Sequence, residues 1–117
     1  MLLADTSVWI EHLRCGHADL VLHLEAGNVL MHPFIAGELA CGTLKNRTLL
    51  LAGFHALPKA TEASNVEVSS FLEKRKLWGL GLGWVDLHLL VSARLTGCRL
   101  LTLDKRLARA ATDLGLA

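Results

Sequence analysis

The sequence predicts a three-layer α/β/α domain with a short central parallel sheet. Short apolar segments that read as strands alternate with longer segments of helical character. Strands that are apolar on both faces are typical of parallel sheets covered by helices on each side. At 117 residues, with 52% apolar and only 20% charged residues, the chain is long enough for one domain, residues 1–117, and too apolar to be disordered.

The predicted elements follow from local signals along the chain. Gly27-Asn28 is a typical helix C-terminal signal, Pro33 suits the first turn of a helix, and "GLGLG" at 79–83 interrupts the chain. The segment "FHALPKATEAS" reads as a loop with room for a short strand before Pro58. Strands are expected at 2–4, at 29–31 and within "CRLLTLD", and helices at 7–14, 19–26, 34–41, 45–52, 65–78, 85–96 and 105–114.

Composition excludes several classes of protein. No apolar stretch approaches the roughly 18 residues needed to span a bilayer, and Asp5 interrupts any signal-peptide core, so a cytoplasmic location without membrane contact is expected. The three cysteines are far apart and odd in number, which predicts reduced, mostly buried thiols. The six histidines show no metal-ligand spacing, so a zinc site is not expected.

The net charge of +1 is not that of a protein that binds nucleic acid through bulk charge. Local basic clusters nevertheless exist, at Lys74–Lys76, at Lys45 with Arg47, and at Lys105 and Arg106 with Arg109. Taken alone, such clusters are usually solvated helix faces. The weak candidates for phosphate contacts are Lys74, Arg75, Lys76, Lys105, Arg106 and Arg109.

Four carboxylates stand at a strand end or on a helix face that the pattern predicts to be buried. Asp5 follows the first strand and Asp104 the last, and ligands of such sheets bind at the carboxyl ends of the strands. Glu38 and Asp86 point in the same directions as the apolar residues of their helices. Each acid alone has a structural explanation, as a helix cap, a partner of the helix dipole or half of an ion pair. The four acids fail to form a common site only if all four of these structural explanations are correct at the same time.

A cluster of four acids would need a cation. Two carboxylates about 4 Å apart repel by roughly 4 kcal/mol at an effective dielectric constant near 20. The summed repulsion of several such pairs is comparable to the whole free energy of unfolding of a small domain, about 5–15 kcal/mol. Bound protons or a metal ion must therefore neutralise some of the carboxylates. Oxygen-only sites suit Mg²⁺ or Mn²⁺, which polarise a phosphate and activate water. The residues thus predict phosphodiester hydrolysis, with Asp5 on the metal and the hydroxyls of Thr6 and Ser7 capping the next helix.

Four blocks of the chain, in order, resemble the PIN-domain ribonucleases and, within them, the VapC-type toxins of bacterial toxin–antitoxin modules. "LLADTSVWIEHLR" is similar to the family's first strand and first acid, and "GELACG" to the segment with its glutamate. "GLGWVDLHLLVSARLTG" resembles the helix of the third acid, and "RLLTLDKRLARAA" the final strand, acid and basic helix. The resemblance covers essentially the whole chain.

The resemblance implies a PIN-like nuclease domain in which Asp5, Glu38, Asp86 and Asp104 form a catalytic, metal-binding quartet. Asp5 and Asp86 would be the principal ligands, and Thr6 or Thr102 would support them by hydrogen bonding. It further implies Mg²⁺- or Mn²⁺-dependent endonucleolytic cleavage of RNA. The implied partners are a second copy in a homodimer and a cognate antitoxin, in a heterotetramer or larger complex, whose C-terminal segment covers the active groove.

Two other classes of protein share some of these features. A phosphoacceptor receiver domain has a similar length and fold, but it needs an acidic pair after the first strand and an acceptor aspartate in mid-chain. Here Asp5 is followed by Thr6 and Ser7, and no aspartate occurs between Asp19 and Asp86. A catalytically silent PIN-like interaction module, which keeps its acids only to bind a partner's basic side chain, stays open as the alternative.

Overall fold

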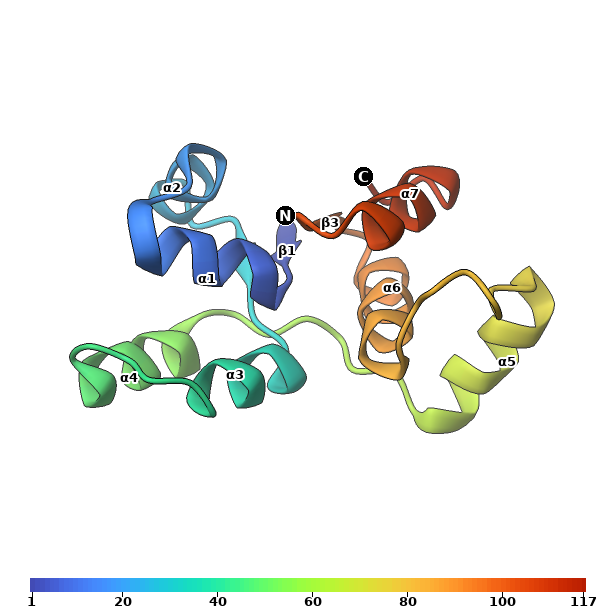
Figure 1. Cartoon of the computed structure of the whole chain (residues 1–117), viewed down its shortest axis with the longest axis horizontal. Helices are drawn as coiled ribbons and strands as arrows, with labels where there is room; N and C mark the ends of the chain where they lie inside the picture. The colour runs from blue at the N-terminus through green and yellow to red at the C-terminus, as the bar shows by residue number, and fades with distance from the viewer.

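A three-stranded parallel sheet lies at the centre of the molecule, which is described for all of residues 1–117 by a computed structural model (Figure 1). The strands are β1 (Leu2–Ala4), β2 (Val29–Leu30) and β3 (Arg99–Leu101), in the order β2-β1-β3. Leu3 of β1 pairs with Leu30 on one side and Leu100 on the other. Because all three strands run in the same direction, their carboxyl ends meet at one edge of the sheet.

Seven helices connect and cover these strands. Pro33 occupies the first turn of its helix, as expected, and a capping box of Ser64 and Glu67 starts another. Gly97, with φ of +77°, ends a third. The helices are α1 (Thr6–Cys15), α2 (Ala18–Glu25), α3 (Pro33–Ala40), α4 (Arg47–Ala56), α5 (Asn65–Arg75), α6 (Trp84–Thr96) and α7 (Lys105–Asp113).

The helices form the two outer layers. Helix α1 packs on β1 and α2 on β2, whereas α6 and α7 pack on β3. Helix α3 lies between α1 and α4, and α5 packs on α6, so that Figure 1 shows the strands in the middle of the elongated molecule. Every residue of α6 from Leu87 to Ala93 is buried, so the middle of this helix is covered by its neighbours on all sides. The three-layer fold is therefore the predicted one.

Several local predictions were wrong. Helix α4 runs on to Ala56, so the first part of the expected loop is helical, and the extra bridge joins Met31 to Lys59, after Pro58 instead of before it. Burial of Phe54 outweighs the low helix propensity of Gly53. Helix α5 ends three residues early, because Lys76 adopts a left-handed conformation with φ of +53°.

The thiols also differ from expectation. Only Cys98 is buried, whereas Cys15 and Cys41 are exposed near the ends of α1 and α3. All three are free. The hydrogen bond from Cys15 Sγ to the Glu11 carboxylate, 2.8 Å long, is the main reason that the pKa of this thiol is raised. Both Cys15 and the buried Cys98, whose pKa is raised by desolvation, are therefore poor sources of thiolate.

None of the helices is both long and apolar enough to cross a bilayer.

Candidate functional site

Asp5 is fixed between the ends of β1 and β3. It follows β1 directly and is only 7% exposed. Its Oδ1 accepts hydrogen bonds from the Ser7 hydroxyl at 2.5 Å and from the Val8 N–H at 3.3 Å. Its Oδ2 accepts one from the Thr102 hydroxyl at 2.5 Å. Because Thr102 follows β3, the neighbouring strand, the parallel pairing of β1 and β3 brings this hydroxyl to Asp5 across 97 residues of sequence.

The roles predicted within Asp5, Thr6 and Ser7 were wrong in one respect. The Asp5 carboxylate itself caps α1, through the Val8 N–H. Ser7 lies in the first turn, where its hydroxyl reaches back to Asp5 and also accepts a hydrogen bond from the N–H of Leu103 at 3.0 Å. The aspartate therefore combines a capping role with its position at the strand ends, and the serine ties it to the segment after β3.

Asp104 is joined to Asp5 through the same threonine. The Thr102 hydroxyl accepts a hydrogen bond from the N–H of Asp104 at 3.0 Å while it donates to Asp5. Asp104 is the N-cap of α7, since its Oδ1 accepts from the N–H groups of Arg106 and Leu107 at 2.9 and 3.0 Å. Its Oδ2 lies outside these two capping bonds and is free to bind other groups.

Glu38 approaches from α3 and is held by Thr6. The Thr6 hydroxyl donates to Glu38 Oε1 at 2.8 Å, across the contact between α1 and α3. The expectation that Glu38 lies on a buried face is wrong: it is exposed, as is Phe34 one turn earlier, whereas Ile35 and Leu39 form the core face of α3. The helix is apolar on its exposed side as well, and for this reason the sequence pattern placed the glutamate inside.

Asp86 lies in the first turn of α6 and is half-buried. Its Oδ2 accepts a hydrogen bond from the N–H of Gly83 at 2.9 Å, which closes the end of the loop onto the helix. No hydrogen bond joins Asp86 to the other three acids. In contrast, the Thr102 hydroxyl connects Asp5 with the N–H of Asp104, and the hydroxyl of Thr6, next to Asp5 in the chain, donates to Glu38.

An aromatic row packs α3 against α6 beside these acids. The rings of Phe34 and His88 are 4.9 Å apart, with His32 next to Phe34 at 5.1 Å and Trp84 next to His88 at 5.0 Å. Burial is the main reason that the pKa values of His32 and His88 are both lowered, so both rings favour the neutral form. The His32 Nδ1 accepts from the N–H of Phe34 at 3.0 Å and caps α3. His32 therefore stabilises the start of α3, and His88 joins α6 to α5 through a hydrogen bond between its Nε2 and Asn65 Oδ1, 3.1 Å long.

The donor atoms suit a hard divalent ion. The four acids and their hydroxyl partners offer only oxygen, which Mg²⁺ and Mn²⁺ prefer. Each of Glu38, Asp86 and Asp104 uses one carboxylate oxygen in its hydrogen bonds, so the second is left to bind an ion. In the arrangement described, however, no three His, Cys, Asp or Glu side chains lie close enough to one another to hold a single ion. The donor atoms therefore suit the metal, whereas the four carboxylates are spread over different elements and no three of them meet at one point.

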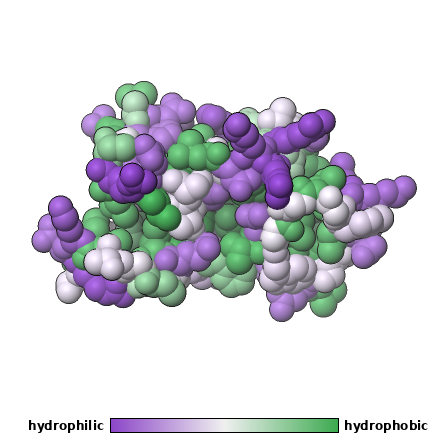
Figure 2. Space-filling model, in the orientation of Figure 1, coloured by the Kyte–Doolittle hydropathy of each residue, from purple (hydrophilic) through white to green (hydrophobic).

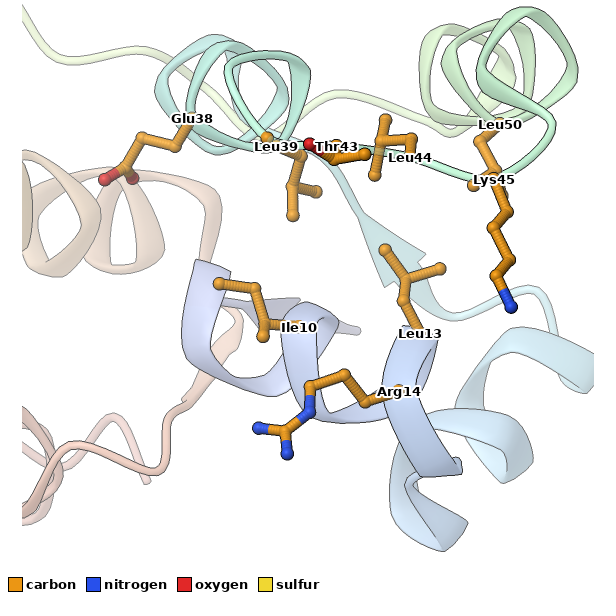
Figure 3. A pocket seen from close by; sticks show the side chains of 10 residues that line it. Ile10, Leu13, Arg14, Glu38, Leu39, Thr43, Leu44, Lys45 and Leu50 are labelled. Carbon is orange, nitrogen blue, oxygen red and sulfur yellow. The ribbon is translucent and has the colours of Figure 1, made fainter.

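An apolar groove of about 590 Å³ leads away from Glu38 between α1, α3 and α4. Figure 3 shows Ile10 and Leu13 on one wall facing Leu39 and Leu44 on the other. Glu38 lies at one end of this row of side chains and Lys45 at the opposite end. The groove therefore joins the acid site to a largely hydrophobic channel whose ends carry opposite charge.

The basic candidates differ in their surroundings. All six are exposed, and hydrophilic side chains gather over α7 in Figure 2. The guanidinium of Arg75 lies 5.7 Å from the centre of the Phe71 ring, so it is engaged in packing on its own helix. Lys105 and Arg106 open α7 directly after Asp104, which places them nearest to the site along the chain.

Comparison with known proteins agrees with this fold. Residues 2–113 match the PIN domain family, and the chain belongs to that family. It is 46% identical over 121 aligned positions to Ribonuclease VapC32 of Mycobacterium tuberculosis, in both strain CDC 1551 / Oshkosh and strain ATCC 25618 / H37Rv. The alignment covers 100% of this chain and 95% of those relatives, and it places the chain among the VapC-type members of the family.

Two contributors to the site were not recognised from the sequence. Ser7 donates to Asp5, and the position two residues after a capping aspartate is where such a hydroxyl can be expected. His32 caps α3, a role for which its place immediately before Pro33 is the available signal. Both act by positioning the elements that carry the acids.

Proposed function

We propose that this protein is a divalent-metal-dependent endoribonuclease that hydrolyses RNA phosphodiester bonds and acts as the toxin of a toxin–antitoxin pair in the cytoplasm. The observation that carries the proposal is the buried Asp5, which Thr102 joins to Asp104 at the adjoining ends of β1 and β3. The full-length similarity to proteins named Ribonuclease VapC32 supports the same class of activity. Asp5, Glu38, Asp86 and Asp104 are the proposed catalytic and metal-binding residues.

The chain's own residues prepare the site for this chemistry. When bound, Mg²⁺ or Mn²⁺ supplies polarisation of the scissile phosphate and an activated water. Ser7 and Thr102 fix both oxygens of the Asp5 carboxylate, which removes the freedom of its side chain to rotate. Thr6 orients Glu38 from the adjacent position on α1, and the Gly83 N–H orients Asp86. These positioning bonds leave acceptor oxygens available on three of the four acids.

Metal removal tests the proposed activity. We expect the purified, antitoxin-free protein to cleave total RNA at internal positions in Mg²⁺ or Mn²⁺, and we expect EDTA to abolish cleavage because the carboxylates alone supply no Lewis acid. Readdition of the metal in excess of EDTA restores the activity. Cleavage that persists in EDTA contradicts the metal-dependent mechanism. A folded protein that cleaves no RNA with either metal supports the silent interaction module instead.

The groove beside Glu38 suits the antitoxin of the proposed pair. Its walls are apolar, so a partner segment with hydrophobic side chains can bury them there. Glu38 at one end favours a basic side chain of the partner, and Arg14 and Lys45 elsewhere in the groove favour its carboxylates. We propose that the antitoxin's C-terminal segment occupies this groove and blocks the acids, within a heterotetramer or larger complex built on a toxin homodimer.

Leu13→Glu is expected to weaken antitoxin binding at least about tenfold while antitoxin-free cleavage of RNA stays near the wild-type rate. Leu13 lines the groove and is 36% exposed, so the charge is tolerated in the free protein but is desolvated under a bound apolar segment. Isothermal titration with the antitoxin measures the affinity. Leu22→Glu, on the exposed side of α2 outside the groove, is the matched control. Equal affinities for the two variants would place the antitoxin elsewhere.

A further inference from the structure

A single arginine is seated against the loop that leads into α6. A Cβ atom built on Gly81 would lie 2.6 Å from Cδ and 2.7 Å from Nη1 of Arg106, so the arginine occupies space that only glycine leaves open. Gly81 has φ of +80°, a conformation that also favours glycine. In Figure 1 this loop, drawn in orange, passes beneath α7, the helix that carries Arg106.

Arg106 lies close to Asp104 in the chain and packs on the loop whose end is bonded to Asp86. Its backbone N–H donates to Asp104 at 2.9 Å, and the loop under its side chain ends at Gly83, whose N–H donates to Asp86. The guanidinium itself is exposed, and its contact is with the glycine instead of a carboxylate. Its five N–H donors are thus available to an external anion, and their planar arrangement matches two oxygens of a phosphate.

A cation beside the acids favours the binding of a substrate phosphate, in addition to the metal of the proposed function. RNA that enters a site with four carboxylates meets repulsion from every one of them, and a positive charge fixed at the edge of the site offsets part of it. Lysines and arginines on flexible surface stems lose side-chain entropy when they bind a phosphate. An arginine that is already packed against a neighbour loses less. Arg75 is packed on Phe71 and Arg106 on Gly81, and of the two it is Arg106 that adjoins Asp104.

We infer that Arg106 binds an RNA phosphate next to the scissile one and that Gly81 is a positioning residue, because its missing side chain leaves the space in which the arginine packs against the loop. The inference deepens the proposed ribonuclease function and rests on it. Arg106 recognises the backbone and not the base, so it contributes affinity without sequence preference. Gly81 contributes by lacking a side chain, because any Cβ atom at that position displaces the guanidinium.

The test compares two glycines of one loop. Gly79 and Gly81 both have positive φ, +73° and +80°, but a Cβ atom at Gly79 would meet nothing within 4 Å. Gly79→Ala and Gly81→Ala therefore share the backbone strain, and only the second disturbs Arg106. The probe is a fluorescent single-stranded RNA of random sequence, with binding followed by anisotropy in Ca²⁺ and cleavage in Mg²⁺.

Arg106→Ala is expected to raise the Kd for this RNA about tenfold and to reduce the slope of log K against log salt by about 0.7, the value for one phosphate on a single strand. Arg106→Lys recovers part of the affinity, and Gly81→Ala weakens binding more than Gly79→Ala does. In the Arg106→Ala background, Gly81→Ala has no additional effect on Kd. KM for cleavage rises in the Arg106 and Gly81 variants with little change in kcat.

Two results would overturn the inference. One is an Arg106→Ala protein with wild-type Kd and salt slope, and the other is equal loss of affinity in Gly79→Ala and Gly81→Ala, which would reduce the loop to a structural role. Failure of the proposed function has a different signature, since it appears as loss of RNA cleavage by the wild-type protein itself.

Discussion

Asp5→Asn is expected to lower the rate of RNA cleavage about 10²- to 10³-fold while the protein stays folded. Asparagine keeps a side-chain oxygen that can accept from the Val8 N–H, so the cap of α1 is retained. What it loses is the negative charge between the Ser7 and Thr102 hydroxyls. Cleavage of an end-labelled RNA measures the rate, and the melting temperature reports the fold.

Asp5→Ala separates the two roles of this aspartate. It removes the charge and the cap together, so it should lose activity as Asp5→Asn does and also about 1 kcal/mol of stability. The hydroxyls of Ser7 and Thr102 then lose their acceptor in a part-buried site, which adds to the cost. A wild-type cleavage rate in Asp5→Asn would leave the residue as a helix cap only and would remove the basis of the proposed site.

Asp86→Asn is expected to lower cleavage by about 10²-fold and to weaken Mn²⁺ binding without unfolding the protein. The amide retains an oxygen for the Gly83 N–H, so the start of α6 is preserved. Loss of the charge near a helix N-terminus costs only about 0.3–1 kcal/mol. Isothermal titration with MnCl₂ measures the metal, and urea denaturation measures stability.

Asp19→Asn is the matched control for Asp86→Asn. Asp19 is also the first-turn acid of a helix, α2, but it is exposed and belongs to none of the hydrogen bonds around Asp5. It should lose the same small dipole contribution with full cleavage and unchanged Mn²⁺ affinity. If Asp86→Asn behaves like Asp19→Asn, or if it unfolds, then Asp86 serves the helix and the site consists of the three acids joined through Thr6 and Thr102.

The elements could largely be predicted from local sequence. Apolar runs at 2–4 and 29–31 identified β1 and β2, and Pro33 and Gly27-Asn28 marked the limits of two helices correctly. The ends of α4 and α5 were missed because a buried Phe54 and a left-handed Lys76 depend on what surrounds them. The exposure of Cys15, Cys41 and Glu38 was missed for a related reason. Apolar residues of α1 and α3 line a groove as well as the core, so an apolar pattern on these helices does not by itself identify the buried face.

The sequence by itself determined the fold class, because strand ends and helix periodicity are local properties of the chain, and it supplied four acids as candidates for the site. Only the tertiary structure decided how these acids are held. The bond from Thr102 to Asp5 exists because β1 and β3 are adjacent in the sheet, and that from Thr6 to Glu38 because α1 packs on α3. The packing of the Arg106 side chain against Gly81 likewise exists because α7 lies next to the loop that precedes α6. These contacts join residues 25 to 97 positions apart, so no local pattern encodes them.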